Sequence, residues 1–139
     1  MCIRDSLKAN PAKEKVVVIS AMGKSTNELE KVVNLYTAGD QSWQTVLEDL
    51  HKKHLVIINE LFDGADNDAV HALGTIIGKA KAFLLQDQSH NYNFVYDQIV
   101  SVGEYISTTI VSIYCNQQGI KNTLLDLSLI HISEPTRPY

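Results

Sequence analysis

The 139-residue sequence has few cysteines, few prolines and no long apolar run. Its two cysteines, Cys2 and Cys115, are too few for a disulfide scaffold, so a reducing, cytoplasmic location is expected. No stretch approaches the ~18 to 20 apolar residues of a membrane span, and residues 1–10 lack the apolar core of a signal peptide. Twelve Lys and Arg against sixteen Asp and Glu give a net charge of −4. These features predict a protein with no nucleic-acid or membrane partner.

The two ends of the chain are unlike its middle, because neither shows periodicity. When 1–6 is written as ATG TGT ATA AGA GAC AG, the reverse complement encodes Leu-Ser-Leu-Ile-His-Ile, the sequence found at 127–132. This DNA resembles the mosaic end of transposase-based sequencing libraries, and the remaining tail continues like its adaptor. We therefore interpret 1–6 and 127–139 as adaptor-derived and 7–126 as the natural portion. The alternative is a genuine tail that matches by chance.

Apolar periodicity in the middle predicts several helices flanked by two short strands. The β-branched run at 15–20 is typical of a buried strand, and 121–126 is a second strand candidate. Between them, four stretches repeat apolar residues at helical spacing: 29–37, 42–62, 68–86 and 94–117. This order favours an α/β fold with a helical insertion. Because two strands cannot form a stable sheet alone, the other strands must lie outside the chain, or the chain is mostly a helical bundle.

The loop at 20–27, Ser-Ala-Met-Gly-Lys-Ser-Thr-Asn, follows the first predicted strand and opens a helix. Small and hydroxyl residues at such a place allow a carboxylate or phosphate to approach the helix N-terminus. The alternative is simple capping, in which Ser25 or Thr26 caps the helix and Glu28 or Glu30 lies in its first turn.

The segment 97–108 carries a second group of polar residues. Four of them recur at spacings of four, three and four residues, which places them on one helical face: Asp97, Ser101, Glu104 and Thr108. The opposite face is apolar, with Ile99, Ile106 and Ile110. A glutamate with hydroxyls one turn away can hold an ammonium group, and the alternative is an ordinary solvated face. Gly103 indicates a close approach or a helix break.

Other residues favour packing over chemistry. Four of the five histidines lie in the middle of the chain and form no metal-ligand spacing with carboxylates on one face: His51, His54, His71 and His90. Cys115 lies in an apolar stretch without a base partner, so we expect a small core residue. Trp43 is expected to be a packing anchor. The sequence therefore offers no metal site.

Together, the two polar segments resemble a known family. Val-Val-Val-Ile-Ser-Ala-Met-Gly-Lys-Ser-Thr-Asn-Glu-Leu at 16–29 resembles the second strand, loop and helix of aspartate kinases. Asp-Gln-Ile-Val-Ser-Val-Gly-Glu-Tyr-Ile-Ser-Thr at 97–108 is similar to their G-E-x-x-S-T helix, and 123–126 to the strand that follows. The resemblance covers 14–126 and implies part of an amino-acid kinase fold. That fold is an α/β/α sandwich, which here would be predominantly helical with two short strands.

The resemblance also implies an activity, the phosphorylation of L-aspartate to 4-phospho-L-aspartate by ATP with Mg²⁺, on the way to lysine, threonine and methionine. By motif position, Ser20, Thr26 and Glu104 would bind the substrate aspartate. Three further residues would support them: Asn27, Ser107 and Thr108. The full-length protein is expected to be a homo-oligomer.

Parts of the family pattern are missing from the sequence. The phosphate loop K-F-G-G-[TS]-S should precede residue 7, and the nucleotide-binding half should follow residue 126. Ser128 stands where the family usually has an arginine. We therefore assign no catalytic residue and expect the chain alone to be inactive. Two alternatives stay open: another amino-acid kinase, such as an acetylglutamate or uridylate kinase, and a non-enzymatic helical interaction domain.

Overall fold

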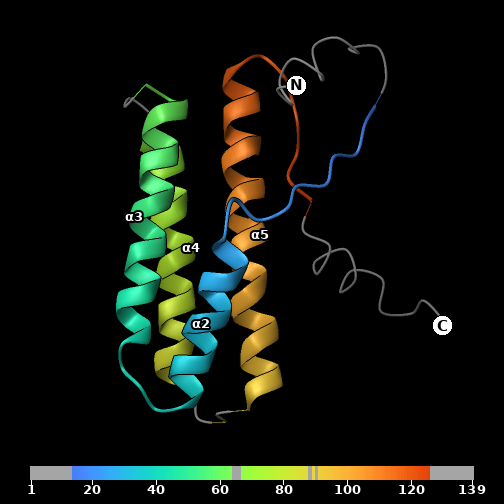
Figure 1. Ribbon diagram of the computed structural model, residues 1–139. Coiled ribbons are helices and arrows are strands. Elements are labelled where there is room, and N and C mark those ends of the chain that lie inside the picture. Colours follow the sequence, from blue (N-terminus) through green and yellow to red (C-terminus); the bar gives the residue numbers. More distant parts are fainter. Residues whose placement is uncertain (1–13, 64–66, 88, 90, 126–139) are drawn as a thin grey trace, which may run out of the picture.

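Four antiparallel helices make up most of the computed structural model, which describes residues 14–63, 67–87, 89 and 91–125. They are α2 (Ser25–Thr37), α3 (Trp43–Leu61), α4 (Asn67–Gln86) and α5 (Tyr92–Gln117). Successive helices run in opposite directions (Figure 1). α2 packs against α3 and α5, and α4 packs against the same two helices. The four stretches of helical periodicity are thereby confirmed.

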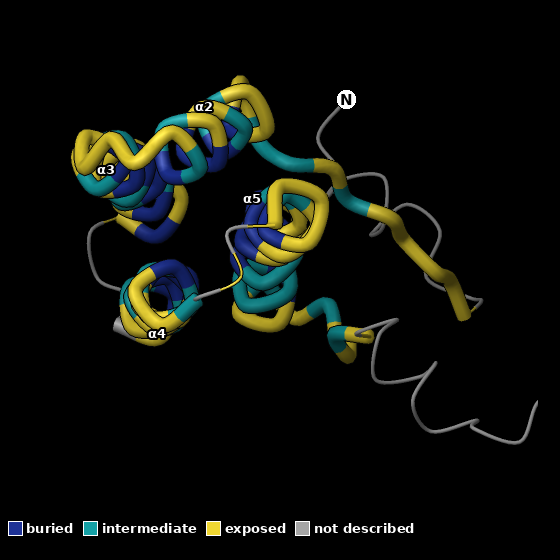
Figure 2. Tube along the Cα trace, turned by 90° about the horizontal axis from the view of Figure 1, so that it is seen from below, coloured by how far each residue is buried: buried dark blue, intermediate teal, exposed yellow. Residues whose placement is uncertain are grey.

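The apolar stripe of each helix faces the centre of this bundle (Figure 2). Leu29 and Val32 of α2, Leu47 of α3 and Ile106 of α5 are all buried in one continuous core. A helix with such a stripe gains most of its stability from packing, because an isolated helix of this length is marginal in water. Trp43 is 2% exposed, which confirms its expected role as a packing anchor.

α2 is half the length of α5, 13 residues against 26. At 1.5 Å per residue the two helices span about 20 Å and about 39 Å, so α2 covers only part of α5. The chain before α2 crosses α5 near its middle (Figure 1). The 20–25 segment and the centre of α5 therefore meet where α2 begins.

The predicted α/β fold is wrong for the part of the chain that the structure describes, which contains no strand. Residues 14–20 and 121–125 have no regular secondary structure, and residue 126 lies outside the described ranges. Val16 and Val18 are 82% and 90% exposed. A β-branched run forms a strand only when neighbouring strands pair with its backbone, and no described segment does so. The amino-acid kinase-like α/β/α sandwich is therefore replaced by a four-helix arrangement.

The turn between α2 and α3 owes its shape to two residues. Gly39 has φ 78°, a conformation that side chains disfavour, and it directly follows Ala38, the C-cap residue of α2. Asp40 then accepts hydrogen bonds from the Ser42 backbone amide at 2.9 Å and from the Ser42 hydroxyl at 2.7 Å. These bonds stabilise the carboxylate and hold the pKa of Asp40 below its ordinary value.

Tyr36 ties the end of α2 to the end of α4. Its hydroxyl donates toward the Asp87 carbonyl at 3.1 Å and the Asp87 carboxylate at 3.0 Å, and its ring meets Trp43 edge-on at 6.0 Å. Burial, and then the bond to Asp87, raise the pKa of Tyr36. None of the helices described has the length and apolar character needed to cross a bilayer.

We predict that Tyr36→Phe lowers the free energy of unfolding by about 1 kcal/mol at neutral pH, the typical net contribution of one hydrogen bond. A phenol whose pKa is raised on folding stabilises the protein below its unfolded pKa, and this contribution disappears as the pH rises through the folded pKa. Wild-type stability should therefore fall above about pH 10, the unfolded tyrosine value. Tyr36→Phe should flatten this fall.

Urea denaturation between pH 7 and pH 11 measures both effects. Tyr105→Phe is the matched control, since Tyr105 is 45% exposed on α5. An equal loss of stability in the two variants would contradict the role given to Tyr36.

Candidate functional site

The start of α2 lies directly against α5 at Gly103. A Cβ atom at position 103 would lie 3.0 Å from Leu29 Cδ1 and 3.2 Å from Ala21 Cβ. The same atom would be 3.7 Å from Ser25 Cβ. The missing side chain therefore allows the loop before α2 to pack on the helix. Of the two alternatives predicted for this glycine, the close approach is confirmed, and α5 continues through it without a break.

A hydrogen bond from Ser107, four residues after Gly103 on α5, also holds this loop. The Ser107 hydroxyl donates to the Ser20 carbonyl at 2.7 Å and also lies 3.1 Å from the Glu104 carbonyl. Ser107 is fully buried, so water does not compete for this bond. The Thr108 hydroxyl donates to the Glu104 carbonyl of its own helix at 2.7 Å. Both hydroxyls thus bind backbone, one of them across 87 residues of sequence.

The N-terminus of α2 has no side-chain cap, so the predicted capping by Ser25 or Thr26 is wrong. Lys24 is the N-cap residue and makes no capping bond. The Ser25 hydroxyl donates instead to the Met22 carbonyl at 2.5 Å. Since the amide groups that open a helix carry a partial positive charge, this terminus can accept an anion. Glu28 lies in the first turn as expected and forms an ion pair with Lys53 of α3.

The predicted site residues fall into two groups. The exposed residues, whose side chains can meet a ligand, are Ser20, Thr26, Asn27 and Glu104. Ser107 is buried and Thr108 is half-buried, and both bind backbone carbonyls. Gly103 packs close to Ala21 and Ser25. Thr26 is the residue after Ser25, and Glu104 is the residue after Gly103. The loop and the centre of α5, nearly 80 residues apart in sequence, thus pack against each other.

A buried histidine of α3 also contacts the start of α2, and sequence reasoning missed this contact. His54 is 1% exposed, and its Nε2 lies 3.4 Å from the Ser25 hydroxyl. The available signal was its place in the apolar stripe of α3, which marks a polar side chain that has to find a partner. Spacing alone did not indicate which partner.

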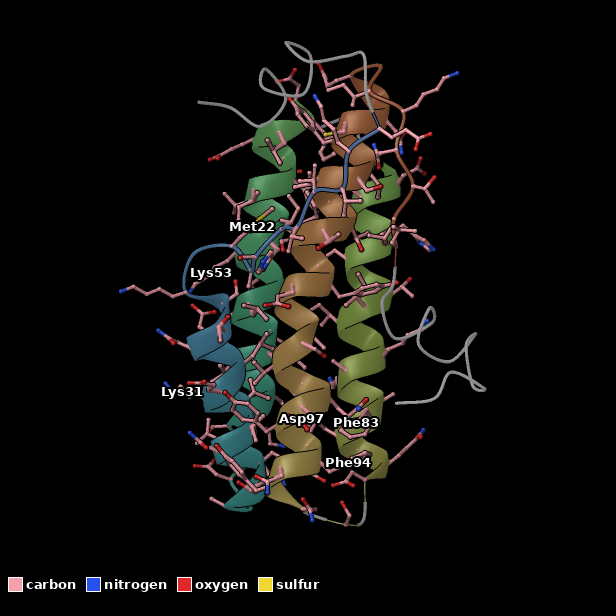
Figure 3. All side chains as sticks on the ribbon, turned by 90° about the vertical axis from the view of Figure 1, so that its right-hand side faces the viewer. Met22, Lys31, Lys53, Phe83, Phe94 and Asp97 are labelled. Carbon is pink, nitrogen blue, oxygen red and sulfur yellow. The ribbon has the colours of Figure 1, made fainter. Side chains whose placement is uncertain are left out.

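The rest of α5's polar face is solvated. Asp97 and Ser101 are exposed. Asp97 lies toward the start of α5, well away from Met22 of the loop (Figure 3). A groove of about 360 Å³ between α4 and α5 is mostly apolar and contains none of the predicted site residues. Among the described residues, no group of three or more His, Cys, Asp or Glu side chains is placed to bind a metal ion.

Comparison with curated proteins gives distant relatives. The chain is 26% identical over 137 residues to bifunctional aspartokinase/homoserine dehydrogenase 1, chloroplastic, of Zea mays, covering 96% of this chain and 15% of that protein. Two further relatives carry the name bifunctional aspartokinase/homoserine dehydrogenase 2, chloroplastic. The chain is 22% identical over 138 residues to the one of Zea mays and 27% identical over 128 residues to the one of Arabidopsis thaliana. These alignments cover 97% and 90% of the chain, but 15% and 14% of the relatives.

The chain therefore spans about 15% of the length of the curated relatives it matches. No family model and no solved structure matches. The maize alignments extend into the terminal segments 1–6 and 127–139, which lie outside the described residues, so the adaptor origin of these ends stays a prediction.

We predict that Gly103→Ala lowers the free energy of unfolding by about 1 to 3 kcal/mol, the usual range for overpacking a core. The added methyl would be 3.0 Å from Leu29 Cδ1 and 3.2 Å from Ala21 Cβ, so these neighbours have to shift by a few tenths of an ångström. Thermal denaturation followed by circular dichroism measures the change.

Gly78→Ala is the matched control, because nothing lies within 4 Å of a Cβ at that helical position. It should stabilise the protein by about 0.5 to 1 kcal/mol, since alanine is the better helix former. A Gly103→Ala protein as stable as Gly78→Ala would contradict the close packing described here.

Proposed function

We propose that the chain is the N-terminal part of the catalytic domain of an aspartate kinase. Such an enzyme transfers the γ-phosphoryl group of ATP to the side-chain carboxylate of L-aspartate. The observation that carries the proposal is the contact between the uncapped N-terminus of α2 and the Gly103–Glu104 step of α5. The distant similarity to proteins whose names include aspartokinase supports it.

The charges around this contact fit a free amino acid. L-aspartate carries two carboxylates and one ammonium group. The positive end of α2 and the exposed Lys24 favour a carboxylate. Glu104 is exposed and directly follows Gly103, the residue of α5 on which the loop packs, and in this proposal its carboxylate binds the ammonium group. The Ser20 and Thr26 hydroxyls are exposed on the loop and can donate to a carboxylate.

The described residues do not make a site for ATP and Mg²⁺. They contain no cluster of metal ligands, and Lys53, next to the start of α2, is paired with Glu28. The resemblance puts the phosphate-binding lysine and the nucleotide-binding half in other parts of the protein. The contribution of this chain is therefore to bind and orient the acceptor, which is a large part of catalysis in phosphoryl transfer.

The complete protein would provide the first step toward lysine, threonine and methionine and would act as a homo-oligomer in the cytoplasm. The names of the relatives combine aspartokinase with homoserine dehydrogenase, and our proposal includes such a fusion for the complete protein.

The complete open reading frame, expressed and purified, tests the proposed activity. We expect ADP release that needs both ATP and L-aspartate, and an acyl phosphate that hydroxylamine traps. The 139-residue chain alone should release none. Activity with N-acetylglutamate or uridine monophosphate in place of aspartate would establish another amino-acid kinase, and inactivity with all acceptors would favour an interaction domain.

We predict that Glu104→Gln in the complete protein lowers kcat/KM for L-aspartate by about 10- to 100-fold, the range for losing one charged hydrogen bond. The KM for ATP should change little, because Glu104 contacts the acceptor only. Asp97→Asn is the matched control, an exposed carboxylate two turns away on the same helical face. Equal effects of the two substitutions would argue against a role of Glu104 in aspartate binding.

A further inference from the structure

Three polar side chains are buried among the described residues: Ser25, His54 and Ser107, at 5%, 1% and 0% exposure. Two of them belong to the segments that form the candidate site. His54 comes from α3, which contributes no other residue to that site. Burying an imidazole is unfavourable unless its nitrogen atoms find hydrogen-bond partners, so the contacts of His54 indicate what holds it there.

Each ring nitrogen of His54 faces a defined group. Nδ1 lies 2.8 Å from the Leu50 carbonyl, one turn earlier on α3. A carbonyl oxygen only accepts, so Nδ1 carries the proton and donates to it. This bond fixes the plane of the ring and directs Nε2 across the α2–α3 contact to the Ser25 hydroxyl, 3.4 Å away. In the neutral ring Nε2 is an acceptor.

Ser25 consequently has two acceptors for one hydroxyl proton. The Met22 carbonyl lies 2.5 Å from its Oγ and His54 Nε2 lies 3.4 Å away. The Met22 carbonyl also accepts from the Ser25 amide at 3.1 Å. Since Ser25 is 5% exposed, water offers its hydroxyl little alternative. The turn at 22–25 is thus closed by Ser25 and backed by the His54 ring.

We propose that His54 is a positioning residue for the substrate-binding loop. It acts through Ser25 on the 20–27 segment, and so sets where the Ser20 and Thr26 side chains stand relative to Glu104. This inference rests on the proposed aspartate kinase function. α5 restrains the same loop from the other side, through the Ser107 bond to the Ser20 carbonyl and the packing of Ala21 on Gly103. The loop backbone is held by two helices while its ligand-binding side chains face solvent.

Kinetics of the complete enzyme test this role through His54→Asn, Ser25→Ala and the double variant. Asparagine keeps a donor for the Leu50 carbonyl but is too short to reach Ser25. His54→Asn should raise the KM for L-aspartate about fivefold, the effect of one lost hydrogen bond, with kcat and the KM for ATP nearly unchanged. Ser25→Ala should raise it at least as much, because it also removes the bond to the Met22 carbonyl. The double variant should be no worse than Ser25→Ala alone, because Ser25→Ala already removes the contact with His54.

His54→Gln provides the rescue, since its longer side chain places an amide near Ser25. It should return the KM for L-aspartate to within about twofold of wild type, well short of the effect of losing a hydrogen bond. His71→Asn is the control for replacing a histidine, because His71 is exposed on α4. Additive effects of His54→Asn and Ser25→Ala, or equal increases in both KM values, would overturn the proposal.

Amide hydrogen exchange on the same purified proteins gives a readout that does not depend on activity. His54→Asn and Ser25→Ala should accelerate exchange in peptides covering 20–30 about fivefold, consistent with the loss of one hydrogen bond. Peptides from α4 should be unchanged. Loosening of the loop in a protein that does not phosphorylate aspartate would refute the proposed function and leave the restraint of the loop by His54 intact. An active enzyme with unchanged exchange and unchanged KM for aspartate would refute the positioning role.

Discussion

The close approach of α2 to α5 at Gly103 is the contact on which the candidate site depends. A Cβ atom at this position would lie 3.0 Å from Leu29 Cδ1 and 3.2 Å from Ala21 Cβ, so both neighbours would have to shift by a few tenths of an ångström. Only because it is absent can the loop before α2 lie on α5, with its Ser20 carbonyl within reach of the Ser107 hydroxyl. This contact packs the segment that carries Ser20 and Thr26 against the middle of α5, where Glu104 follows Gly103.

The polar residues around the contact divide by exposure. Ser25, His54 and Ser107 are buried and bind backbone or one another, so they define the shape of the loop. Thr26 and Glu104 are exposed and can bind a ligand. Such a division is expected of a binding site, because groups that hold a substrate must be positioned by neighbours whose own hydrogen bonds are already satisfied.

Much of the helical structure was predictable, and the strands were not. Helical periodicity is a local property, because the spacing of apolar residues within one stretch of chain is enough to predict an amphipathic helix. A strand instead needs backbone partners that are distant in sequence. The valines at 16–18 have the composition of a buried strand, yet in the described structure they have no such partner and are exposed. The predicted side-chain cap was wrong for a local reason, because the Ser25 hydroxyl donates to the Met22 carbonyl three residues earlier.

The sequence by itself determined the four helices, their apolar faces and the two polar segments, because each depends on spacing within one stretch of chain. It also indicated Gly103 as a site of close approach by another segment or of a helix break. Only the tertiary structure decided what that neighbour is, that Ser107 binds the Ser20 carbonyl, and that His54 is the partner of Ser25. These contacts join residues 29 to 87 positions apart. Their partners are selected by the packing of whole helices, and no local pattern encodes that choice.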